Sequence, residues 1–185
     1  KELNYPITSP ISTSVIERKL GDAVEALGVS VIRNSKKIIP PQEIDIFLPE
    51  HNLAIEVNGV YWHSEEIGGK GKDYHRDKML KCEAQGIRLI QFWDTELTDN
   101  FELCVSMISS ILGRNQKVHA RKCEIKVIDS ETAKEFMNTN HLQGFRGGNH
   151  IGLYRWGALA AVMTTGASQF RRNCTEIKRF ATLRG

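Results

Sequence analysis

The chain of 185 residues contains only four cysteines, and no two of them are close in sequence: Cys82, Cys104, Cys123 and Cys174. Structural zinc sites usually draw on closely spaced Cys or His pairs, and small disulfide-stapled domains use regular cysteine spacings. Neither pattern occurs here. We therefore expect reduced cysteines in ordinary core or surface positions, as in proteins of a reducing cytoplasm.

Long apolar runs are also missing from the sequence. None approaches the roughly 20 residues that span a bilayer, and no signal peptide opens the chain. Hydrophobic residues make up 41% of the chain and charged residues 25%, which is enough for a packed core and excludes wholesale disorder. We expect a globular protein without membrane segments.

Charge is unevenly distributed along the chain. Residues 1–114 hold 13 Lys and Arg against 17 Asp and Glu, a net −4, whereas residues 115–185 hold 12 against 5, a net +7. A basic half suits binding to a polyanion. An acidic half would repel phosphate unless metal ions neutralised it.

Hydrophobic periodicity predicts helices at 12–27, 72–85 and 99–112, strands at 29–33 and 87–93, and a hairpin over 43–59. After a polar, basic stretch it predicts a strand at 123–128, a helix at 130–139, a hairpin over 150–165 and a strand at 176–183. The predicted fold class is α/β (α+β), with a mixed sheet flanked by helices and then a smaller, incomplete α+β segment. The predicted domains are 1–113 and 123–185, joined by a linker at 114–122.

Two carboxylates occupy neighbouring strands of the first predicted hairpin. Asp45 and Glu56 can share a divalent cation if both point to one face, and the Val57 carbonyl could add a third oxygen. Both could instead be polar residues on a solvent face. Glu56 lies between two apolar residues of a strand expected to be central, and burying a carboxylate without compensation is costly. We therefore favour a functional pair.

A histidine follows the same strand. His63 has an ordinary pKa suited to general acid–base work, and Asp77 in the next helix could orient its ring. His75 is a rival partner, but it shares a predicted helix face with Met79 and Cys82, which favours packing. Glu17 is either a capping-box residue with Ser14 as N-cap or part of the site.

The segments IDIFLP, LAIEVNGVYWHSE and YHRDKMLKCEAQGIRLIQFW resemble known nucleases in this order. Asp45 with Glu56 resembles the PD-(D/E)xK core, with Asn58 where that motif has lysine. The Gly-x-x-Trp-His run ending at His63 and the Arg-Asp ending at Asp77 resemble very-short-patch-repair (Vsr) endonucleases. The set Glu17, Asp45, His63 and Asp77 is similar to that of their phage homing relatives. The resemblance covers about residues 12–112.

This resemblance implies a role for each matching residue. Asp45, the Val57 carbonyl and Glu56 would hold Mg²⁺ or Mn²⁺, and Glu17 would organise metal-bound water. His63, oriented by Asp77, would be the general acid–base. Further residues would contact double-stranded DNA, the aromatic pair as a wedge in the base stack: Tyr61, Trp62 and Lys78. The alternative for Trp62 is core packing.

Two departures from the family pattern bear on activity. Asn58 removes a usual transition-state cation, so His63 or Lys78 has to compensate. The zinc site of the Vsr enzymes has no counterpart, which favours target cleavage over mismatch nicking.

Residues 123–185 resemble, more weakly, an acetyltransferase-like domain appended to phage endonucleases. Its later elements and a complete acyl-CoA phosphate loop are absent, so we expect a truncated or reduced domain that grips DNA. Basic residues would contact phosphates, or else form a solvated face: Arg146, Arg155, Arg171, Arg172, Lys178 and Arg179.

The function predicted from the sequence is a site-directed, metal-dependent DNA endonuclease of the homing type. Its expected location is the cytoplasm of a bacterial or phage-infected cell, and homodimerisation is left open. The alternatives are an inactive DNA-binding protein on a nuclease fold, a Vsr-type mismatch nickase, and an acyltransferase, against which the incomplete cofactor loop argues.

Overall fold

A computed structural model of the chain describes residues 13–59 and 72–184 and divides it into two compact units between Ile108 and Ser109. Each unit is described by itself. Among the described residues, no helix has both the length and the apolar character that a membrane span needs.

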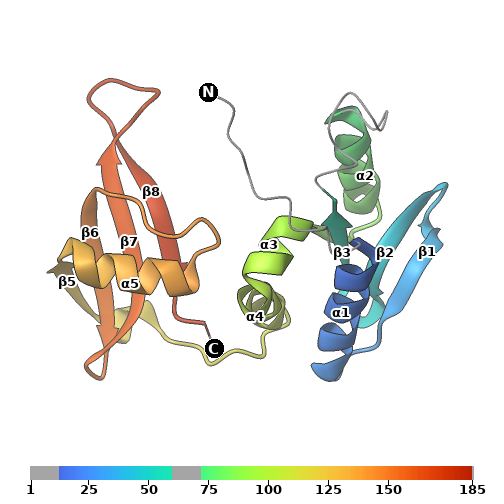
Figure 1. The fold of residues 1–185 in the computed structure, drawn as a ribbon, viewed down its shortest axis with the longest axis horizontal. Coiled ribbons are helices and arrows are strands. Elements are labelled where there is room, and N and C mark those ends of the chain that lie inside the picture. Colours follow the sequence, from blue (N-terminus) through green and yellow to red (C-terminus); the bar gives the residue numbers. More distant parts are fainter. Residues whose placement is uncertain (1–12, 60–71, 185) are drawn as a thin grey trace. The chain divides into compact units, whose positions relative to one another are not determined.

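The first unit is a mixed four-stranded sheet with helices (Figure 1). Its elements are α1 (Thr13–Ala26), β1 (Ile32–Ile39), β2 (Gln42–Leu48), the 3₁₀ helix η1 (Pro49–His51), β3 (Leu53–Asn58), α2 (Lys72–Ala84), β4 (Arg88–Trp93), α3 (Asp94–Asp99) and α4 (Phe101–Ile111). The strand order is β1-β2-β3-β4. The first three strands are antiparallel, and β3 pairs with β4 in parallel. This confirms the predicted mixed sheet flanked by helices.

The centre of this sheet is β3, all of whose residues are buried. The parallel β4 lies on one side of β3, with Glu56 opposite Gln91 and Asn58 opposite Trp93. Parallel neighbours need a crossover, and α2 lies within the crossover between these two strands. A helix is therefore brought close to the strand that carries Glu56.

Several boundaries differ from the sequence prediction. Strand β1 continues to Ile39, so the two prolines at 40 and 41 form the turn into β2. Ser14 lies within α1, which already includes Thr13, and the predicted N-cap is therefore wrong. The short α3 was missed because its residues are mostly polar and lack periodicity. Glu96 stabilises its start by accepting a hydrogen bond from the Trp93 N–H at 3.0 Å.

The second unit is an antiparallel sheet with one helix across one face (Figure 1). Its elements are the 3₁₀ helix η3 (Ala120–Lys122), β5 (Glu124–Ile128), α5 (Ser130–Asn140), β6 (Asn149–Arg155), β7 (Ala158–Ala167) and β8 (Thr175–Thr182), with strand order β5-β6-β7-β8. Asp129 caps α5 by accepting from the Thr132 N–H at 2.8 Å. The core joins three residues of α5 to two of the sheet: Ala133, Phe136, Met137, Val162 and Ala181.

Close packing at the start of β6 gives the first prediction. A Cβ atom added to Gly148 would lie 2.3 Å from the backbone oxygen of Thr165, whereas one added to Gly147 would meet nothing within 4 Å. We expect Gly148→Ala to lower the free energy of unfolding by about 1–3 kcal/mol, since the strand itself must move. Urea denaturation measures the change. The matched Gly147→Ala variant should change it by less than about 1 kcal/mol; equal effects would contradict the proposed clash.

Candidate functional site

The predicted carboxylate pair lies at the point where β2 and β3 separate, which we call the fork. The paired register between these strands ends at Ile46 opposite Ile55, one residue before Asp45 on β2 and Glu56 on β3. Beyond that point the Val57 N–H donates to Asp45 Oδ2 at 2.8 Å, and the Asp45 N–H donates to Glu56 Oε1 at 3.2 Å. Each carboxylate thus binds backbone of the other strand. This exchange ties both side chains to the sheet.

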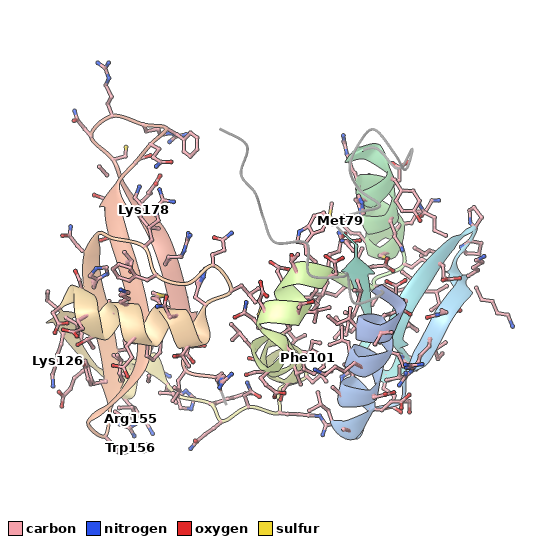
Figure 2. The ribbon with its side chains drawn as sticks, in the orientation of Figure 1. Met79, Phe101, Lys126, Arg155, Trp156 and Lys178 are labelled. Atoms are coloured by element: carbon pink, nitrogen blue, oxygen red, sulfur yellow. The ribbon has the colours of Figure 1, made fainter. Side chains whose placement is uncertain are left out.

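A buried lysine completes this pair. The Lys78 ammonium donates to Glu56 Oε2, and the two residues are only 5% and 6% exposed. Lys78 lies one helical turn before the buried Cys82, so this is the face that α2 turns inward. The sequence prediction placed Met79 on that face and was wrong, because Met79 (Figure 2) is 46% exposed. The sequence predicted that Lys78 contacts DNA. In the structure its ammonium group binds Glu56 inside the site.

The surroundings of Glu56 make its carboxyl group harder to ionise than that of an ordinary glutamate. Burial, and then repulsion from Asp45, raise the pKa of Glu56 to about 7, while the Lys78 ammonium opposes the rise. One lysine therefore does not fully compensate two carboxylates in this environment. Additional positive charge at the fork would be favourable.

A third carboxylate faces the same place from α1. Burial and repulsion from Asp45 raise the pKa of Glu17. The Asn34 side chain, with its amide nitrogen turned toward both groups, donates to Glu17 Oε1 at 2.8 Å and to the Asp45 carbonyl oxygen at 3.1 Å. Asn34 has a φ of 49°, a left-handed conformation that asparagine tolerates better than most residues. The sequence prediction missed it, because its partners on α1 and β2 are distant in sequence.

The arrangement fits a hard divalent cation in part. Among the residues that the structure describes, no cluster of three or more His, Cys, Asp or Glu side chains is arranged to hold a metal ion. Mg²⁺ usually takes only one or two protein carboxylates, with waters and substrate phosphate completing its shell. Asp45 and Glu17 meet that requirement chemically. Glu56 does so less well, because its two oxygens already accept from the Asp45 N–H and from Lys78.

Four predicted site residues of the first unit remain, of which the structure describes one. Asp77 is exposed on α2, next to Lys78 in sequence. Tyr61, Trp62 and His63 lie outside the described residues. Asn58 is buried, and its amide donates to Gln91 Oε1 at 3.0 Å. Position 58 therefore links β3 to β4. The positively charged side chain beside Glu56 is Lys78 of α2.

Three of the predicted DNA-binding arginines of the second unit lie on two loops, whereas Arg155 is the last residue of β6 and Arg179 lies within β8. Arg146 is exposed between α5 and β6, and Arg171 and Arg172 are exposed between β7 and β8. Lys178 is half-buried and pairs with Glu176 at 2.7 Å. The exposed arginines are available to phosphates, whereas Lys178 already has an anionic partner.

The ion pair at the fork predicts a pH-dependent loss of stability in Lys78→Met. Removing the ammonium leaves Glu56 buried without its cation, so its pKa should rise further above its unfolded value. At about pH 8.5 the unpaired carboxylate should cost roughly 3–5 kcal/mol of unfolding free energy. At about pH 5.5 the folded state keeps Glu56 protonated and the loss should be smaller.

Urea unfolding of the metal-free protein at both pH values measures this difference. The control is Lys81→Met, which removes an exposed lysine of the same helix and should have little effect at either pH. A loss for Lys78→Met that does not depend on pH would contradict the pairing.

Comparisons with known proteins show a similarity in structure but none in sequence family. No family model matches the sequence, and no curated protein matches it. Among solved structures, the chain is similar to one named "Homing Endonuclease I-Bth0305I Catalytic Domain", with a TM-score of 0.44 and 22% sequence identity. The match covers 55% of this chain and 97% of that one.

Proposed function

We propose that the first unit is the catalytic domain of a DNA endonuclease that hydrolyses phosphodiester bonds with Mg²⁺ or Mn²⁺. The observation that carries the proposal is the buried Glu56–Lys78 ion pair beside the half-buried Asp45 at the fork of β2 and β3. A hydrophobic core there would cost less than buried ionic groups. Carboxyl groups with raised pKa values beside a buried cation, as at Glu17 and Glu56, are typical of sites that handle charge during a reaction.

Asp45 would be the principal metal-binding residue, with Glu17 and the Val57 carbonyl as further oxygen donors. When bound, the metal ion would activate water and stabilise the charge that develops on the phosphate. The hydrogen bond from the Val57 N–H to Asp45 Oδ2 fixes the orientation of this carboxylate in advance. Asn34 does the same for Glu17. Preorganised ligands lower the cost of binding a cation between groups that repel each other.

Lys78 would supply the positive charge that Asn58 cannot provide. A lysine held in a buried site by one carboxylate is already desolvated, so its charge acts more strongly on a nearby phosphate than it would in water. Glu56 would then act mainly by positioning Lys78, which differs from the metal-ligand role predicted from sequence. His63 and Asp77 keep their proposed roles as general acid–base and its orienting partner.

Double-stranded DNA is the proposed substrate, and cleavage at defined targets is the proposed type of activity. The excess of basic residues after position 114 supports binding to a polyanion. A homodimer would place two such sites on one duplex. The second candidate, a DNA-binding protein without cleavage activity, is favoured only by Asn58. An assay of plasmid cleavage with Mg²⁺ or Mn²⁺ separates the two.

The metal-binding role of Asp45 predicts that Asp45→Asn binds DNA normally but cleaves it more than about 100-fold more slowly, because the charge that would hold the cation is lost. Cleavage of plasmid under single-turnover conditions measures the rate, and EDTA should abolish it in the unmodified protein. The control is Asp99→Asn, the same chemical change at an exposed carboxylate of α3. Normal cleavage by Asp45→Asn would remove this residue from the site.

The proposed histidine–aspartate pair predicts non-additive losses. We expect His63→Ala to slow cleavage by roughly 10²–10⁴-fold, the usual contribution of general acid–base catalysis. Asp77→Asn should also slow it, and the double variant should be little slower than His63→Ala, because both changes remove one shared function. Single-turnover rates at saturating protein measure all three. Multiplicative losses would show that the two residues act independently.

A further inference from the structure

The hairpin between β6 and β7 turns on a residue poorly suited to a tight turn. Arg155 pairs with Ala158, so Trp156 and Gly157 form a two-residue loop, and their φ angles are 51° and 80°. Loops of this kind, with both central φ angles positive, strongly favour Asn-Gly. A bulky side chain in the left-handed region is an outlier. If the loop served only to reverse the chain, asparagine would do so with less strain.

The strained tryptophan is presented to solvent rather than packed. Trp156 is 80% exposed. The Arg155 guanidinium lies 4.1 Å from the centre of its ring, and Arg155 also donates to the Lys122 carbonyl at 2.7 Å. Both side chains are labelled in Figure 2. The ring is therefore held by a cation that is itself anchored to η3. Backbone strain combined with a fixed, exposed aromatic side chain indicates a binding function.

The surroundings of Trp156 are basic. A hollow of about 160 Å³ beside the ring is lined by Lys117, His119, Lys122, Arg155 and Trp156, together with Gln116 and Val118. Residues 114–122 contain four Lys or Arg and no Asp or Glu. An apolar partner would meet few apolar side chains here. A partner with a flat aromatic face and adjacent negative charge would match both the Trp156 ring and the basic side chains around it.

We propose that this tip binds an unpaired stretch of DNA, with a nucleobase stacked on Trp156 and phosphates on Lys117 and Lys122. That the partner is DNA rests on the proposed function. That it is a nucleotide rests on the exposed Trp156 ring and the basic side chains beside it. Bases inside a duplex are already stacked on both sides, so a ring at a hairpin tip suits a single strand or an opened step. The second unit would then recognise strand opening as well as phosphate charge.

The decisive variant is Trp156→Asn, because asparagine suits the turn better than tryptophan. Its thermal unfolding midpoint should equal or exceed that of the unmodified protein. Its affinity for a fluorescein-labelled single-stranded 20-mer, measured by anisotropy in EDTA, should fall about 5- to 150-fold, the usual cost of losing one base–aromatic contact. Trp156→Phe should restore most of the affinity. The control Phe180→Ala removes an exposed aromatic residue of β8 and should leave affinity unchanged.

Salt dependence tests the lysines separately. The double variant Lys117→Gln/Lys122→Gln should reduce the slope of log affinity against log salt by about 1.4, while Trp156→Asn should leave the slope unchanged. Unaltered affinity in Trp156→Asn, an equal loss in Phe180→Ala, or tighter binding to anionic lipid vesicles than to DNA would overturn the proposal. Because binding is measured without metal, absence of cleavage activity would count against the proposed nuclease and not against this contact.

Discussion

The two hydrogen bonds by which the Asp45 and Glu56 carboxylates link β2 to β3 are the constraint on which the first unit depends. Where two strands separate, their backbone N–H groups lose regular partners and need others. Here each strand satisfies an N–H of its neighbour with a carboxylate, at Val57 and at Asp45. The fork is thereby stabilised by the same two groups that concentrate negative charge. Fold and candidate chemistry cannot be changed independently at this point.

The negative charge at the fork is met by a cation from α2. Burial, and then repulsion from Asp45, raise the pKa of Glu56, and a nearby cation reduces the cost of ionising it. Lys78 is that cation, carried by the helix between the parallel strands β3 and β4. Buried ion pairs rarely add net stability compared with hydrophobic packing. Lys78 and Glu56 are therefore better explained by the reaction proposed for the site than by the needs of the fold.

The second unit combines a conventional core with unusual hairpin ends. Its α5 packs on the sheet through small and apolar side chains, as in most two-layer domains. Two strongly exposed aromatic side chains lie at hairpin ends next to arginines: Phe170 precedes Arg171 and Arg172, and Trp156 follows Arg155. Loops carry aromatic and cationic residues at lower cost than strands do, because they do not compete with core packing. This division supports a role in gripping nucleic acid.

Sequence patterns by themselves determined most helices and strands, since periodicity and turn residues act locally: Ile16, Leu20 and Val24 recur at helical spacing, and all three are buried on α1. They also indicated Asp45 and Glu56 as a candidate pair, because a carboxylate inside an apolar strand stands out in the sequence even when its partner is unknown. Only the tertiary structure decided that Lys78 points inward and that Asn34 contacts Glu17. These contacts join residues far apart in the chain, and a lysine in a polar helix carries no local sign of burial. Ion pairing compensates its desolvation, and that pairing exists only once α2 has packed on the sheet.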